Sequence, residues 1–129
     1  MSTSYLLDTS VLVLSLKQDR AVRQRLAQAT SLYISVVTLG ELYYGAEHST
    51  NFKQNFAEVQ ELARVATILP CDITTARIYG RTKQEQSNKG LKIPDNDLWI
   101  ASTAYQHRLT LAARDRHFMW LEGLTLEQW

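Results

Sequence analysis

The chain has one cysteine, two prolines and five glycines among its 129 residues. A single thiol, Cys71, excludes an internal disulfide and any metal site that is built from several cysteines. No apolar stretch approaches the roughly 20 residues that a membrane-spanning helix needs. The opening MSTSYLLDTS also lacks the basic start and apolar run of a signal peptide. We therefore expect a cytoplasmic protein that makes no membrane contact.

Neither sign of charge dominates the chain, since 14 Lys and Arg stand against 13 Asp and Glu. No global electric field commits such a protein to nucleic acid or to a membrane surface, so any basic surface must be local. Hydrophobic residues make up 45% of the sequence, enough for one core in a chain of this length. Because no repeat, low-complexity tract or Pro/Gly linker divides it, residues 1–129 are expected to form a single domain.

Short apolar runs rich in β-branched residues alternate with longer segments of helical periodicity. Strands are expected at residues 5–7, 32–36, 67–69, 109–112 and 124–126. Helices are expected at residues 11–16, 21–29, 51–66, 73–88 and 96–107, with a further helix opening at Thr38. This alternation predicts an α/β fold in which helices flank both faces of a central parallel sheet of about five short strands.

Four acidic residues fall at the expected carboxyl ends of strands, where ligands of such sheets gather. Asp8 follows the first strand, Glu41 lies in the first turn after the second, and Asp115 follows the fourth. Asp97 begins the helix that leads into that fourth strand. Carboxylates about 5 Å apart repel by roughly 3 kcal/mol per pair at an effective dielectric near 20. Such a cluster needs raised pKa values or a bound cation, and oxygen ligands favour Mg²⁺ or Mn²⁺ over zinc.

Each acid also has a purely structural alternative, which the sequence leaves open. Asp8 could cap the helix that follows it, and Glu41 fits a capping box with Thr38. Asp97 could serve the dipole of its helix, and Asp115 could be an ordinary turn residue. Asp97 nevertheless heads the segment LWIASTA, which is apolar or small on nearly every side, so a charge there is only partly solvated.

Four segments in order resemble the motifs of PIN-domain ribonucleases, and most closely those of the VapC toxins of prokaryotic toxin–antitoxin pairs. They are YLLDTSVLVL, ISVVTLGELYYGA, IPDNDLWIASTA and LAARDRHFMWLEGLTLEQW, and the resemblance runs from Tyr5 to Trp129. It implies a PIN-like fold with metal ligands at Asp8, Glu41 and Asp97, and with Asp115 at the family's fourth acidic position. Relatives often carry Thr, Ser or Asn just before that fourth acid, where this chain has Ala113 and Arg114.

The resemblance implies a Mg²⁺-dependent endoribonuclease, with Mn²⁺ as a substitute, in which a metal-bound water hydrolyses RNA phosphodiester bonds. The catalytic residues would be the same four acids that hold the metal. The resemblance also implies three kinds of partner, namely an RNA substrate, a small antitoxin protein and a second copy of the chain in a homodimer. Asp95 lies outside the matched position and is expected to cap its helix.

Several residues outside the acidic set are candidates for contacts with these partners. Arg114, Arg116 and Thr9 are expected to touch the substrate. Residues 77–92 carry five basic residues against one glutamate, which predicts either a phosphate track or a solvated helix face. The segment that contains Tyr43, Tyr44, Phe52 and Phe56 forms either an antitoxin groove or plain core. Three late side chains are expected to close the core rather than stack on bases: Met119, Trp120 and Trp129.

Two other classes of function remain as alternatives. A PIN-fold binding module without catalysis would keep the fold, although the three best-matched acids are all present. An aspartate-nucleophile phosphotransferase would use Asp8 in LLDTS, but that chemistry requires a second aspartate two residues later. Ser10 stands at that position, which argues against this class.

Overall fold

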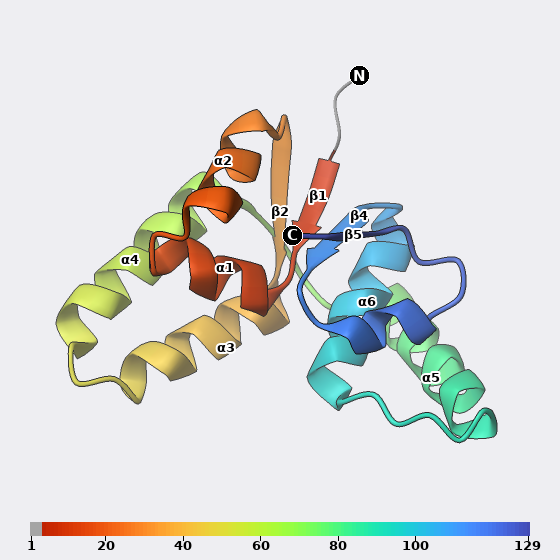
Figure 1. The fold of residues 1–129 in the computed structure, drawn as a ribbon. Helices are drawn as coiled ribbons and strands as arrows, with labels where there is room; N and C mark the ends of the chain where they lie inside the picture. The colour runs from red at the N-terminus through yellow and green to blue at the C-terminus, as the bar shows by residue number, and fades with distance from the viewer. Residues whose placement is uncertain (1–3) are drawn as a thin grey trace.

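The computed structural model describes residues 4–129, in which five strands form one sheet of order β3-β2-β1-β4-β5 (Figure 1). All four strand pairings are parallel, which confirms the expected α/β architecture. The strands are β1 (Ser4–Leu7), β2 (Ser31–Ser35), β3 (Thr67–Leu69), β4 (Thr110–Ala113) and β5 (Leu126–Gln128). The helices are α1 (Thr9–Leu16), α2 (Arg20–Gln28), α3 (Val36–Glu47), α4 (Phe52–Val65), α5 (Ile73–Asn88), α6 (Asp95–His107) and the 3₁₀ helix η1 (Arg116–Trp120).

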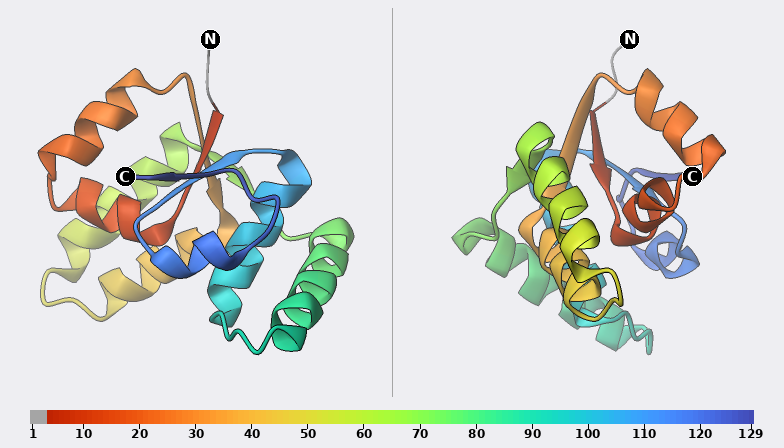
Figure 2. Two further views of the ribbon diagram at one scale, coloured as in Figure 1. Left: turned by 45° about the vertical axis from the view of Figure 1, so that its right-hand side comes forward. Right: turned by 90° about the vertical axis from the view of Figure 1, so that its left-hand side faces the viewer.

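The two central strands, β1 and β4, carry apolar side chains on both faces of the sheet. Leu6 pairs in register with Leu111, and these two belong to a core formed with α6 and Phe118 of η1. Leu7 pairs with Ala112, and these belong to a second core formed with α1, α2, α3 and α4. Figures 1 and 2 show the helices gathered on the two sides accordingly, with α5 packed on α6. The prediction of helices on both faces is therefore confirmed.

The carboxyl ends of β1, β2 and β4 meet at one edge of the sheet, where α1 and α3 begin. The backbone N–H of Asp8 donates to the carbonyl of Ala112 at 2.9 Å, which ties the end of β1 to β4. Helix α3 also contacts α6. The edge therefore collects residues from four elements that are far apart in sequence.

Two helix starts differ from the prediction. Helix α3 begins at Val36, because the hydroxyl of buried Ser35 accepts a hydrogen bond from the Val37 N–H at 3.1 Å and caps it. Thr38 is fully buried inside the helix, so the predicted capping box with Glu41 is wrong. Helix α1 begins at Thr9, two residues before its expected start, and is capped by Asp8, as the sequence allowed.

Helix α6 begins at Asp95 and has Pro94 at its N-cap, so the prediction that Asp95 caps this helix is wrong. The carboxylate of Asp95 instead accepts from Lys83 Nζ at 2.9 Å and from the Tyr79 hydroxyl at 2.8 Å. Helix α5 begins as predicted, since Asp72 forms a capping box with Thr75. No helix within residues 4–129 is long and apolar enough to cross a membrane.

The three late side chains that were expected to close the core separate into two groups. Trp129 is buried, and its ring packs edge-on against Tyr5 at 5.0 Å between centroids, as predicted. Met119 and Trp120 lie on η1 and are 67% and 45% exposed, so their predicted place in the core is wrong. Phe118 is buried in the core instead. The short helix η1 can turn only one face toward the core, so its neighbours Met119 and Trp120 stay at the surface.

Candidate functional site

Asp8 is a nearly fully buried carboxylate at the end of β1, with only 4% of its surface exposed. Its Oδ2 accepts a 2.7 Å hydrogen bond from the Ser10 hydroxyl, whereas its buried Oδ1 has no hydrogen-bond partner in residues 4–129. Burial raises the pKa of Asp8, the Ser10 hydroxyl opposes that rise, and the nearby charge of Asp97 adds to it. A buried carboxylate oxygen without a donor is an atom that a cation would satisfy.

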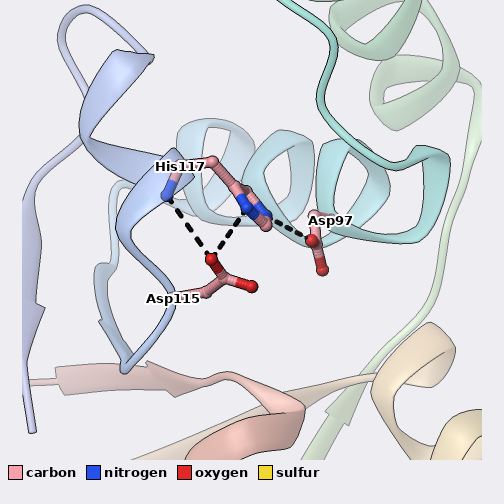
Figure 3. A group of neighbouring side chains, drawn as sticks. All are labelled: Asp97, Asp115 and His117. Atoms are coloured by element: carbon pink, nitrogen blue, oxygen red, sulfur yellow. Dashed lines mark hydrogen bonds and ion pairs between the residues drawn. The ribbon is translucent and has the colours of Figure 1, made fainter.

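Asp97, Asp115 and His117 form a compact group beside Asp8, drawn in Figure 3. His117 Nε2 lies 2.5 Å from Asp97 Oδ2, and its Nδ1 lies 2.7 Å from Asp115 Oδ1. The imidazole therefore stands between the two carboxylates (Figure 3). One ligand atom from each of the three residues lies within 4.8 Å of the others, a spacing that suits a shared ion.

The half-buried Asp97 lies close enough to the other acids and to His117 for their charges to affect its pKa. Burial raises the pKa of Asp97, contact with His117 lowers it, and the charges of Asp115 and Glu41 raise it again. Asp97 in turn raises the pKa of Asp8. The structure thus brings all four predicted acids to the carboxyl edge, near enough to act on one another's charge.

Glu41 is positioned by the residue that follows Asp8 and not by its own helix terminus. The Thr9 hydroxyl donates to Glu41 Oε1 at 2.7 Å and also lies 3.3 Å from the hydroxyl of Thr38. Thr9 was predicted to touch the substrate, but its side chain is engaged in holding Glu41. Nothing in the sequence indicated that Glu41 would be the partner of this hydroxyl.

One pattern is common to the four acids. Each has one carboxylate oxygen that is fixed by a neighbouring side chain: Asp8 Oδ2 by Ser10, Glu41 Oε1 by Thr9, and Asp97 Oδ2 and Asp115 Oδ1 by His117. For Asp8 the second oxygen, Oδ1, is buried and has no hydrogen-bond partner within residues 4–129. Oriented carboxylate oxygens are the ligands that Mg²⁺ and Mn²⁺ prefer. Within residues 4–129, however, the group whose ligand atoms have the spacing of a shared ion contains Asp97, Asp115 and His117, and Asp8 and Glu41 lie outside it.

The segment after β4 also carries two basic residues that flank Asp115 in the sequence. Arg114 and Arg116 are exposed and form no ion pair with any residue from 4 to 129. The predicted basic track on α5 is partly neutralised, because Lys83 pairs with Asp95 and Lys89 pairs with Glu122. Arg114 and Arg116 are therefore the better placed candidates for contact with an anionic substrate.

Sequence reasoning missed the position of His117 between two acids. The two-residue spacing from Asp115 is visible in the sequence, but the approach of Asp97 depends on the packing of η1 against α6. Ser10 was also undervalued, since its oxygen accepts from the Arg114 N–H at 3.3 Å while its hydroxyl donates to Asp8. It thereby links the loop after β4 to the end of β1.

Known proteins resemble the chain in sequence and in fold. Residues 5–121 match the PIN domain family. Ribonuclease VapC2 of Haemophilus influenzae is 33% identical, covering 97% of each chain. The tRNA(fMet)-specific endonuclease VapC of Salmonella typhimurium is 30% identical, again over 97% of both chains. A chain of the crystal structure of DNA-bound VapBC from Salmonella typhimurium superposes with a TM-score of 0.93 at 30% identity, covering 100% of this chain and 99% of that one.

Proposed function

Since the chain belongs to the PIN-domain family and is VapC-like over its whole length, we propose that it is a Mg²⁺-dependent endoribonuclease and the toxin of a VapBC-type toxin–antitoxin pair. The ribonuclease and endonuclease names of its relatives support the general activity. The observation that carries the metal-dependent part is the set of four acids at one edge, each anchored by a neighbouring side chain, with an unpartnered oxygen on buried Asp8 and ion-like spacing at Asp97 and Asp115. Mn²⁺ is expected to replace Mg²⁺, since both take oxygen ligands.

Different residues of the chain have different roles in the proposed hydrolysis. Asp8, Glu41, Asp97 and Asp115 would hold the ion, which supplies positive charge against the scissile phosphate and acidifies water. Asp8 Oδ1, buried and without a donor, either holds the ion or takes up the proton of the attacking water. Arg114 and Arg116 bind the phosphates that flank the cleaved bond. Water as the nucleophile needs no 2′-hydroxyl, so preference for RNA rests on contacts with the substrate.

The toxin role implies an antitoxin partner, and we infer that a homodimer is the working form. Support for the antitoxin partner comes from the likeness to a chain of a solved VapBC structure. A groove between α1, α3 and α4, lined by Val13, Leu16, Leu42 and Val59 among others, presents apolar surface for an antitoxin segment. Tyr44, 70% exposed, stands on α3 and is a candidate for the same contact.

Cleavage of RNA by the purified chain tests the proposal directly. We expect cleavage of tRNA(fMet) or another structured RNA with Mg²⁺ or Mn²⁺, no cleavage in EDTA, and recovery when the metal is restored. The Asp8→Asn variant serves as the matched inactive protein. Cleavage that persists in EDTA would refute the metal-dependent mechanism. A chain that binds Mn²⁺ and cleaves no RNA would instead be a binding module with a PIN fold.

A further inference from the structure

Trp120 is a large aromatic side chain left in solvent beside the acidic cluster. Its side chain is on η1, the same short helix that carries His117, and the two rings lie 6.2 Å apart between centroids, tilted by 48°. His117 contacts both Asp97 and Asp115, so Trp120 is only one side chain away from the proposed ligands. The indole is 45% exposed, whereas Phe118, two residues earlier, is fully buried.

The other two tryptophans have partners that cover them. Trp99 stacks on Tyr79 with the ring planes 8° apart at 4.1 Å between centroids. Trp129 packs against Tyr5, and the guanidinium of Arg25 lies 5.8 Å over its ring. Among the residues from 4 to 129, the aromatic neighbour of Trp120 is His117, whose ring is tilted and does not stack on the indole, and Trp120 stays 45% exposed. An exposed indole next to a reaction site can receive a flat ligand.

The charges around Trp120 indicate what that ligand is. Arg114 and Arg116 lie in the same segment, are exposed, and have no ion-pair partner within the described chain, residues 4–129. Proteins that bind single-stranded nucleic acid combine such cations, which follow the phosphates, with aromatic rings on which unpaired bases stack. Bases inside an A-form duplex are stacked on one another and are not free to pack on a side chain.

We propose that Trp120 is the base-stacking residue of this protein. An unpaired RNA base next to the scissile phosphate stacks on the indole face while Arg114 and Arg116 bind the flanking phosphates. This inference rests on the proposed ribonuclease function and adds to it a contact between Trp120 and an unpaired base. Trp120 thus positions the substrate and takes no part in the chemical step.

Two substitutions at Trp120 distinguish the effect of an aromatic face from the effect of side-chain size. Trp120→Leu keeps an apolar side chain and removes the aromatic face, whereas Trp120→Phe keeps a face. With a stem–loop RNA as substrate, Trp120→Leu should raise KM roughly tenfold at little change in kcat, a loss typical of one stacked base. Trp120→Phe should stay close to the wild type, and so should Met119→Ala, the control at the neighbouring exposed position. Because the indole is partly exposed, all three variants should keep the wild-type circular dichroism spectrum.

A binding measurement makes the test independent of turnover. A stem–loop RNA with 2-aminopurine in its loop is titrated with the Asp8→Asn protein, in which cleavage is blocked. Stacking on Trp120 should quench the 2-aminopurine fluorescence, and the added Trp120→Leu change should remove that quenching. The quenching should also be absent when the label sits in the paired stem.

Three results would overturn the inference. An unchanged KM in Trp120→Leu would show that no base uses the indole, and equal losses in the Leu and Phe variants would show that stacking is not the cause. An unchanged KM together with weaker homodimer formation or weaker antitoxin inhibition would assign Trp120 to a protein interface. If the wild type cleaves no RNA at all, the proposed function fails first, and that outcome is distinct from the other three.

Discussion

Replacing Asp8 with asparagine should make the metal-free protein more stable, although the same change should abolish cleavage. Asp8 is 4% exposed, and its Oδ1 has no donor within residues 4–129. A buried polar atom without a partner costs about 1–3 kcal/mol, and more when it is charged. Asparagine keeps an acceptor for the Ser10 hydroxyl, and its amide nitrogen is still a buried polar atom at the Oδ1 position, so the gain is the extra cost of burying a charge rather than a neutral group. For a chain of this length, the gain corresponds to a rise of roughly 3–10 °C in Tm.

The sign of the pH dependence follows from the raised pKa of Asp8. Because burial raises the pKa of this carboxyl in the folded state above its ordinary value of 3.8, the folded protein binds the proton more tightly than the unfolded chain. The protonated form therefore stabilises the fold at acidic pH, and this stabilisation is lost as the pH rises through the folded-state pKa. The advantage of Asp8→Asn should be full above the folded-state pKa of Asp8 and should shrink as the pH falls through that pKa toward 3.8.

The assay is thermal unfolding followed by circular dichroism in EDTA, repeated with Mg²⁺ or Mn²⁺. A ligand at 100 times its Kd stabilises the folded state by about 2.7 kcal/mol, so metal should raise the Tm of the wild type and leave Asp8→Asn nearly unchanged. Asp95→Asn is the matched control, because Asp95 is an exposed acid paired with Lys83. Its Tm should be unchanged or slightly lower. A lower Tm for Asp8→Asn in EDTA would refute the account of a destabilising carboxylate.

Three further predictions concern the other residues of the site. Asp97→Asn should abolish RNA cleavage while the circular dichroism spectrum stays native, and near-normal cleavage would contradict its place among the ligands. Thr9→Val should lower activity by roughly tenfold to a hundredfold, since it frees Glu41 from its 2.7 Å hydrogen bond, whereas Thr9→Ser should keep most of the activity in the same assay. The double variant Arg114→Gln, Arg116→Gln should bind RNA more weakly and lower the slope of log K against log salt by about 2, and an unchanged slope would place both side chains away from phosphate.

Much of the fold was predictable because residue type and hydrophobic periodicity indicated the same strands and helices. Short β-branched runs separated by helical periodicity predict a parallel sheet, and Thr67–Leu69 begins and ends where the pattern placed it. The helix starts were harder to predict, because several side chains near one strand end can cap. Ser35 and Thr38 are both good caps by residue type, and only the packing that buries Thr38 inside α3 decides between them.

The positions of the acids could be predicted from the topology of the sheet, whereas the positions of the neighbouring side chains on η1 could not. Strand order and the parallel arrangement bring Asp8, Glu41 and Asp115 to one edge whatever their side chains do. The orientation of η1 follows no such rule, because it depends on which face of one short helix finds room against α6. His117 between two carboxylates and Trp120 in solvent both result from that choice. For this reason the place of Trp120 was predicted wrongly and the contacts of His117 were missed.

Capping and metal binding looked like competing explanations for Asp8, yet the two oxygens of one carboxylate serve them separately. Oδ2 accepts from the backbone N–H and the hydroxyl of Ser10 at the start of α1, and Oδ1 stays free. Glu41 divides its oxygens in the same way, with Oε1 fixed by Thr9. An acid that is anchored through one oxygen loses little further side-chain freedom when the other binds an ion, because its rotamer is already set. The hydroxyls of Thr9 and Ser10 therefore orient the carboxylates in advance of the metal, and loosening either hydroxyl should weaken metal affinity before it weakens the fold.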